Sequence, residues 1–137
     1  IMKIILNKEK SKIYNFDYTN INSNLAFDIT IGKEKLIESF FIYRSGLSLK
    51  YFEEMLNQGS NFAIDLVGSL TIQFIAKDNF EWCVRIEMRD GSVAEELLSK
   101  DVIIKMINEY WESIANEYKI NVSKLIEMQE NYFHSDR

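Results

Sequence analysis

Apolar and polar residues alternate along two neighbouring segments, and this is the clearest pattern in the chain. The segments run from Leu70 to Ile75 and from Phe80 to Arg89, with a polar Lys77-Asp78-Asn79 turn between them. In the second segment the apolar residues are Phe80, Trp82, Val84, Ile86 and Met88. A period of two predicts an antiparallel hairpin with one buried face and one solvent-facing side. Ile75 is the exception, an apolar residue on the polar side.

Similar alternation predicts further strands, which we expect at Ile4–Leu6, Tyr14–Tyr18, Leu25–Ile31, Leu36–Arg44 and Phe62–Val67. The run from Phe40 to Tyr43 breaks the alternation and is also compatible with a helix. Short polar residues at positions 19–24 favour a loop. Gly68 predicts a bend, and Asp90-Gly91 predicts a turn that closes the block of strands.

Helical spacing appears in four places. Leu49, Phe52 and Leu56 share one face between Ser48, a predicted N-cap, and Gly59, which ends the segment. Residues 92–99 are predicted to be helical through Ala94–Leu98. A long amphipathic helix is expected at 101–118 with Asp101 as its cap, and a last one at 122–133 with Asn121 as its cap. The apolar stripe of the long helix is Ile103, Ile107, Tyr110, Trp111, Ile114 and Tyr118.

Strands and helices occupy separate stretches of the chain, which is typical of the α+β class. We predict one α+β domain over residues 2–137. It comprises an antiparallel sheet of about five or six strands, one inserted short helix, and two or three C-terminal helices packed on one face. At 137 residues the chain can bury roughly 68% of its unfolded surface. The other face of the sheet would be open to solvent or to a partner.

Acidic residues are concentrated in the second part of the chain. The net charge is −5 and the isoelectric point is about 5.0. Residues 1–50 hold eight Lys/Arg against five Asp/Glu, whereas residues 51–137 hold eight against sixteen. A nucleic-acid-binding domain usually carries a basic surface, so we expect no nucleic-acid partner. The acidity either serves solubility alone or marks a surface that meets a basic partner.

The apolar runs are shorter than the roughly 18 residues of a membrane helix, so we expect no membrane partner. Positions 1–8 lack the apolar core of a signal peptide, and we expect a cytoplasmic location. Cys83 is the only cysteine, which excludes an intrachain disulfide and a cysteine-based zinc site within one chain.

Catalytic chemistry has little support in the sequence, and we predict no enzyme, cofactor or metal. His134 is the single histidine and lies near the C-terminus, where chains fray. Cys83 is interpreted as a partly covered structural thiol. The pairs Glu53-Glu54 and Glu95-Glu96 point about 100° apart on a helix and so do not converge. Glu81 and Glu87 are about 20 Å apart along one strand, too far for a carboxylate pair.

Two surfaces are therefore candidates for binding a partner. The polar side of the predicted hairpin contributes Thr71, Gln73, Ile75, Glu81, Arg85, Glu87 and Arg89. The acidic side of the long helix contributes Glu109, Glu112 and Glu117. Each set is also compatible with an ordinary solvent-facing surface.

The order helix, strand, hairpin, turn and long helix over residues 49–118 resembles the small immunity proteins of bacterial polymorphic-toxin systems, including contact-dependent growth inhibition. The segments that carry the resemblance are 51–56, 62–66, 69–72, 80–86 and Asp90-Gly91. The resemblance implies a cytoplasmic, non-enzymatic protein that binds and blocks the toxin domain of its own strain, commonly a basic nuclease. It lies in architecture and hydrophobic texture, with no diagnostic motif.

The alternative is a small-molecule-binding or hydrolytic α+β protein. Phe74, Trp82 and Trp111 would then line an apolar pocket between the sheet and the helices. A scaffold role is a third option. The oligomeric state stays open.

Overall fold

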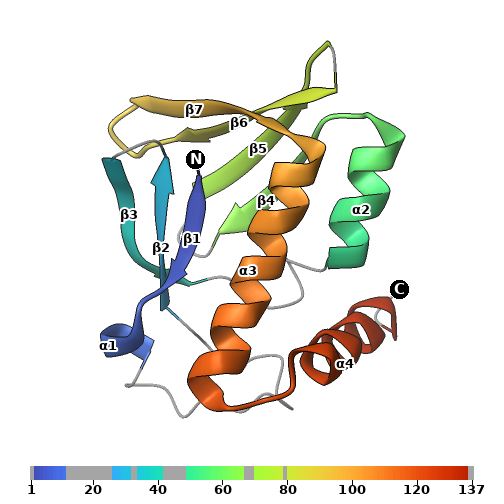
Figure 1. The fold of residues 1–137 in the computed structure, drawn as a ribbon. Helices are drawn as coiled ribbons and strands as arrows, with labels where there is room; N and C mark the ends of the chain where they lie inside the picture. Colours follow the sequence, from blue (N-terminus) through green and yellow to red (C-terminus); the bar gives the residue numbers. More distant parts are fainter. Residues whose placement is uncertain are drawn as a thin grey trace.

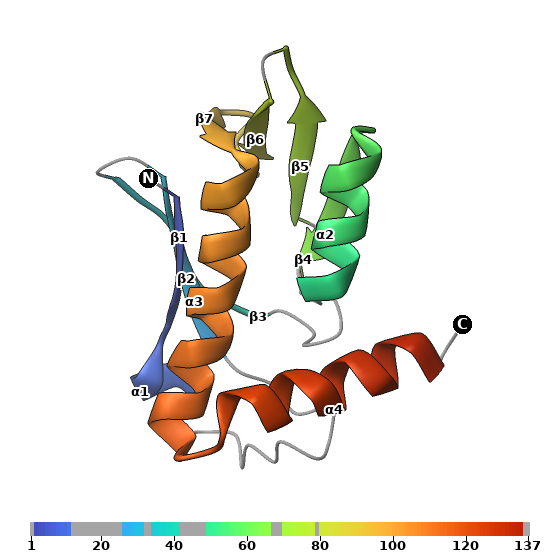
Figure 2. The same ribbon diagram turned by 45° about the vertical axis from the view of Figure 1, so that its right-hand side comes forward.

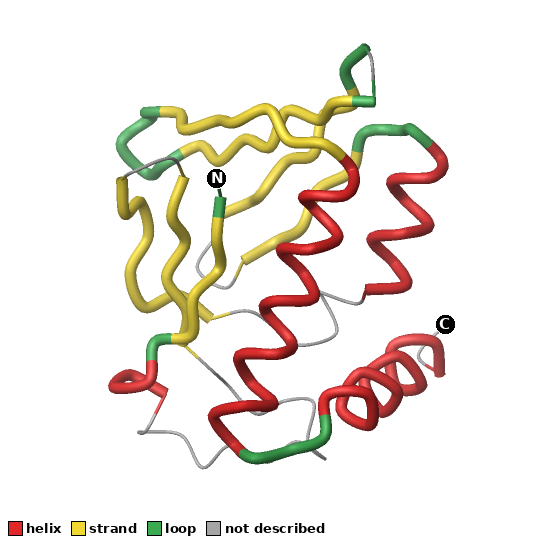
Figure 3. Tube along the Cα trace, viewed as in Figure 1, coloured by secondary structure: helices red, strands yellow, loops and turns green. Residues whose placement is uncertain are grey.

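The computed structural model describes residues 2–11, 26–31, 34–41, 49–66, 70–78 and 80–135. It has mixed α and β structure, which confirms the predicted α+β class (Figures 1 and 3). In chain order the elements are β1 (Lys3–Leu6), α1 (Lys8–Ser11), β2 (Ala26–Ile31), β3 (Glu34–Phe41), α2 (Leu49–Gln58), β4 (Phe62–Leu66), β5 (Leu70–Ala76), β6 (Glu81–Glu87), β7 (Val93–Ser99), α3 (Lys100–Tyr118) and α4 (Val122–Ser135).

The strands form two antiparallel sheets, so the prediction of a single sheet is wrong. One has the order β1-β2-β3 and the other β4-β5-β6-β7. Helix α3 lies between them, as the two views show (Figures 1 and 2). The reason is that α3 is buried on more than one side: Tyr110 contacts Phe27 of β2, while Ile103 and Ile107 belong to the same core as residues of β5 and β6.

Strand predictions from alternation are otherwise confirmed where the structure describes the chain. β1, β2, β4 and both strands of the hairpin lie at the expected positions. The segment at Leu36–Arg44 forms β3 rather than a helix, up to Phe41. The predicted strand Tyr14–Tyr18, the loop at 19–24, the cap Ser48 and the bend at Gly68 lie outside the described residues.

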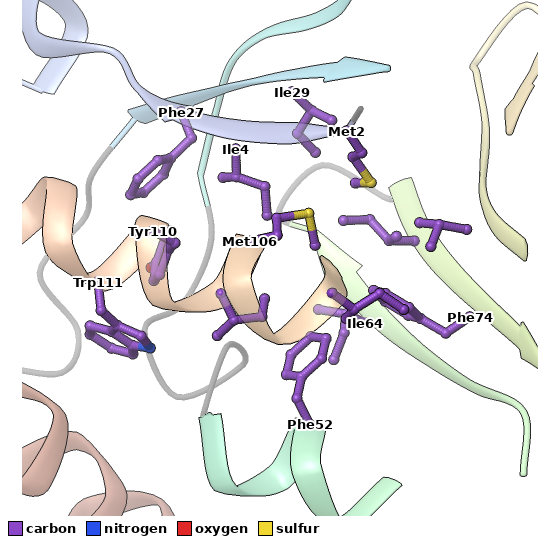
Figure 4. Close-up of a cluster of buried hydrophobic side chains, with 14 of the residues drawn as sticks. Met2, Ile4, Phe27, Ile29, Phe52, Ile64, Phe74, Met106, Tyr110 and Trp111 are labelled. Carbon is purple, nitrogen blue, oxygen red and sulfur yellow. The ribbon is translucent and has the colours of Figure 1, made fainter. Parts of the chain in front are cut away.

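Aromatic packing joins α2 to the four-stranded sheet. Phe62 of β4 and Phe74 of β5 are opposite each other and stack, with ring centroids 4.7 Å apart. The fully buried ring of Phe52 meets both edge-on, at 5.7 Å from Phe62 and 5.4 Å from Phe74. Figure 4 shows Phe52 pointing from α2 towards Phe74. Gly59, with φ +71°, follows the last turn of α2 as predicted.

Capping fixes the ends of the two C-terminal helices. The hydroxyl of Ser99 accepts a hydrogen bond from the backbone N–H of Val102 at 3.2 Å, so Ser99 caps α3 and the prediction of Asp101 is wrong by two positions. Asp101 lies in the first turn, where its charge complements the helix dipole. Asn121 caps α4 as predicted, because its side-chain oxygen accepts from the N–H of Lys124 at 3.0 Å.

Val93–Ser99 form strand β7, and the prediction of a helix at 92–99 is wrong. The strand pairs with β6 in a register that runs from Glu87↔Val93 to Glu81↔Ser99. Alanine, glutamate and leucine favour helices in isolation, but pairing and burial decide the state of a segment beside a sheet. As a consequence, Glu95 and Glu96 lie on opposite faces of the sheet.

Phe80 departs from the predicted pattern as well. The alternation placed it with the buried side chains of the second strand, whereas it lies in the β5–β6 turn with 91% of its side chain exposed. The other apolar residues of that face agree with the prediction, since Trp82, Val84 and Ile86 are buried.

Candidate functional site

One face of the four-stranded sheet is covered and the other is open. The covered face carries Ile72, Phe74, Trp82, Val84 and Ile86, all buried in the core with α2 and α3 (Figure 2). We call the opposite side the outer face. Its residues are Ala63, Asp65, Thr71, Gln73, Ile75, Glu81, Cys83, Arg85, Glu87, Val93, Glu95, Leu97 and Ser99. All of them except Cys83 are exposed or half-buried, so the outer face can be reached from solvent.

A polar row crosses the middle of the outer face. In the strand register Ala63 is opposite Gln73, Gln73 is opposite Arg85, and Arg85 is opposite Glu95. The Arg85 guanidinium donates a hydrogen bond from Nη1 to Oε1 of Gln73 at 3.0 Å. This bond links Arg85 to the neighbouring strand β5, and with Glu95 the row holds both signs of charge.

Two hollows lie on either side of the Gln73 to Arg85 bond. The polar hollow has a volume of about 340 Å³ and is lined by Leu70, Thr71, Gln73, Glu87, Met88 and Arg89. The apolar hollow has a volume of about 500 Å³ and is lined by Ile75, Lys77, Cys83, Arg85, Glu95, Glu96 and Leu97. Leu97 is 58% exposed and Val93 on the same strand is 44% exposed. The outer face therefore combines charges, hydrogen-bonding groups and accessible apolar side chains.

Cys83 lies at the bottom of the apolar hollow, opposite Ile75 on one side and Leu97 on the other. Burial raises the pKa of its thiol, and the nearby Glu95 carboxylate raises it further. The thiol donates to Oε2 of Glu95 at 3.5 Å. Since the thiolate is the nucleophile, these surroundings suppress its reactivity, in keeping with the interpretation of Cys83 as a structural thiol.

We expect Cys83 to react slowly with an aromatic disulfide reagent near pH 8, at well below the rate of the unfolded chain. Substitution Glu95→Gln removes the negative charge beside the thiol, so the thiol pKa should fall and the reaction should be faster. The thiol pKa of Cys83 is higher in the folded protein than in the unfolded chain, where it is about 8.5. The folded state is therefore stabilised by the neutral thiol at pH values below the unfolded-state pKa, and this stabilisation is lost as the pH rises through the folded-state pKa. Urea titrations of wild type and Cys83→Ala between pH 7 and 10 measure this difference. Equal reaction rates for the folded and unfolded chains would contradict the suppressed reactivity of Cys83.

The structure brings most of the predicted partner-binding residues together. Thr71, Gln73, Ile75, Glu81, Arg85 and Glu87 are all on the outer face. Arg89 follows the end of β6 and lines the polar hollow.

The acidic residues of α3 belong to a different surface, because α3 packs against the covered face of the sheet (Figure 1). Glu109 lies 4.0 Å from Lys105, and Glu117 forms an ion pair with Lys8 at 3.0 Å. Glu112 is exposed. One compact partner contact could not include both this surface and the outer face.

Strand β7 also contributes to this site, although residues 92–99 were expected to be helical. Val93, Glu95 and Leu97 reach the outer face because residues 93–99 form a strand. The sequence Val-Ala-Glu-Glu-Leu-Leu at 93–98 has no alternation of apolar and polar residues, so its periodicity carried no signal for a strand, and its composition favoured a helix.

The described residues can also be checked for a metal site and for an apolar ligand pocket. Among these, no group of three or more His, Cys, Asp or Glu side chains is placed to hold a metal ion. Phe74, Trp82 and Trp111, which the alternative function would place around a pocket, are buried in the core. The alternative function, a small-molecule-binding or hydrolytic protein, stays a prediction. The side chain of His134 lies outside the described part of the chain.

Comparison of the chain with protein-family models, with curated proteins and with solved structures gave no match. In the described segments, no helix has the length and apolar character needed to cross a membrane.

Proposed function

We propose that this chain is an immunity protein, which binds and neutralises a cognate bacterial toxin domain by direct contact. The observation that carries the proposal is the outer face: a sheet surface that is open to solvent across β4 to β7 and holds charged, polar and apolar side chains beside two hollows. Specific protein interfaces combine these elements, with apolar contacts inside and a polar rim around them.

The negative net charge of the chain supports a basic partner, most simply a nuclease-type toxin. The chain carries a net charge of −5, and the part from residue 51 onwards holds sixteen of the 21 acidic residues. Long-range attraction between an acidic inhibitor and a basic toxin raises the association rate. The fixed pattern of Glu81, Arg85 and Glu87 would then select the correct partner, because a mismatched charge at the contact is costly.

In this proposal the protein acts in the cytoplasm without a reaction of its own. The raised pKa of Cys83 supports the absence of a thiol nucleophile. The resemblance in element order over residues 49–118 agrees with the same function.

The first step of the test is to read the open reading frames next to this gene, where the proposal predicts one that encodes a large secreted protein. The purified chain is then mixed with the inactivated C-terminal domain of that protein. We expect a one-to-one complex with a dissociation constant in the nanomolar range at low salt, measured by calorimetry. Affinity should fall as the salt concentration rises, because screening weakens attraction between exposed charges. No association at micromolar concentration and low salt would refute the proposal.

A further inference from the structure

Phe80 is the most exposed large apolar side chain among the described residues, at 91%. It lies in the turn between β5 and β6, and both views show the ends of these strands projecting beyond the helices (Figures 1 and 2). Exposing an aromatic ring to water is unfavourable, and large aromatic residues account for much of the binding energy at protein interfaces.

The backbone of Phe80 is strained as well. Its φ of +62° lies in the left-handed region, where a bulky side chain is a genuine outlier. The turn closes with two hydrogen bonds, in which the N–H of Lys77 donates to the carbonyl of Glu81 at 2.9 Å and the N–H of Glu81 donates to the carbonyl of Asp78 at 3.4 Å. Turns of this kind usually have glycine or asparagine at the left-handed position. Elsewhere this chain does use glycine for positive φ, at Gly59 and Gly91.

Two unfavourable features therefore coincide at one residue. Glycine at position 80 would remove both the strain and the exposed ring without disturbing the strand register. Residues held in strained backbone conformations cluster at functional sites, so the outlier at position 80 motivates a functional hypothesis.

The surroundings of Phe80 indicate the kind of partner. Glu81 follows Phe80 directly and Asp78 lies two residues before it, and both are exposed. With Lys77 also exposed in the same turn, acidic groups outnumber basic ones around the ring by two to one. The apolar hollow with Ile75 and Leu97 lies at the same end of the sheet, because Ile75 pairs with Cys83 only two residue pairs before the turn closes. A complementary surface would offer an apolar pocket bordered by lysine or arginine.

We propose that Phe80 is the anchor of the toxin interface, inserting into an apolar pocket with a basic rim on the toxin domain. This inference rests on the proposed function and adds to it the residue that contributes most of the affinity and the chemistry of its receiving pocket. The ring enters the complex from the end of the outer face, and Ile75 and Leu97 extend the apolar contact onto the sheet.

The test compares wild type with Phe80→Gly, using the same inactivated toxin domain as probe. The substitution should raise the thermal midpoint by about 2 to 5 °C, because it relieves the backbone strain. It should weaken binding by about 30-fold or more, the loss expected for an interfacial anchor. A variant that is more stable but binds less well cannot be explained by damage to the fold.

Two variants serve as controls. Lys119→Gly relieves the same kind of strain, since Lys119 is exposed with φ +54° at the end of α3, away from the outer face. It should raise the thermal midpoint and leave the dissociation constant unchanged. Phe80→Tyr keeps the ring and should bind within about threefold of wild type.

The outcomes separate this inference from the proposed function. If wild type does not bind the toxin domain, both are overturned. If wild type binds and Phe80→Gly binds equally well, the immunity function stands and the anchor is overturned. If Phe80→Gly binds weakly but has lost stability, the residue is structural and the anchor is again overturned. Weak binding with unchanged or increased stability supports the anchor.

Discussion

Replacing Phe52 with alanine is expected to lower the free energy of unfolding by about 3–5 kcal/mol, the usual cost of removing a buried aromatic ring. Phe52 is fully buried and meets Phe62 and Phe74 edge-on, so the substitution leaves a cavity between α2 and the sheet and removes two favourable ring contacts. Urea denaturation with an unchanged m-value measures the loss.

The matched control is Glu53→Ala, one residue further along α2. Glu53 is exposed, and its replacement should change the free energy of unfolding by no more than about 0.5 kcal/mol. Hydrogen exchange should show faster opening of α2 in Phe52→Ala, because this ring ties the helix to β4 and β5. A loss below about 1 kcal/mol would mean that α2 contributes little to the stability of the sheet.

Reversing two charges on the outer face, with Glu81→Lys and Glu87→Lys together, should slow association with the toxin domain about tenfold or more at low salt. Both side chains are exposed, and the change turns two attractive charges into repulsive ones. Stopped-flow measurements at about 10 mM and about 150 mM salt should show the difference shrinking as the Debye length falls from about 30 Å to about 8 Å. The thermal midpoint should stay nearly unchanged.

The competing acidic surface supplies the control. Glu109→Lys with Glu112→Lys alters the total charge equally, but at exposed positions of α3, the helix that packs on the covered face of the sheet. It should slow association less than the outer-face pair, because only the overall charge is affected. If both double variants slow association equally, only the total charge matters and the outer face is not supported as the interface. A larger effect of the α3 pair would place the interface on α3. Loss of folding in the outer-face pair would show that Glu81 and Glu87 are structural.

Two misassignments in the sequence analysis have the same physical origin. Residues 93–99 contain good helix formers, and only the neighbouring edge of β6 makes them a strand. Phe80 continues the apolar alternation of β6, and only the closure of the turn at Lys77 and Glu81 removes it from the strand. In both cases local preference was weaker than the hydrogen bonds available from a distant or neighbouring segment.

The residues of the candidate site were likewise predicted in part by local alternation and decided in part by strand pairing. Alternation in the hairpin correctly separated Gln73, Arg85 and Glu87 from the buried side chains. It could not reveal that β7 adds Leu97 and Glu95 beside them, because pairing between strands depends on contacts that a single segment does not encode.

By itself, the sequence determined the α+β class, the hairpin with its buried and solvent-facing sides, and the buried stripe of α3. These features follow from local periodicity, which each segment carries in its own residues. Only the tertiary structure decided that the strands divide into two sheets around α3, that β7 completes the outer face, and that Phe80 is exposed in the β5–β6 turn. These features depend on which segments pack against each other. The free energy of that packing comes from burial and from hydrogen bonds between distant parts of the chain.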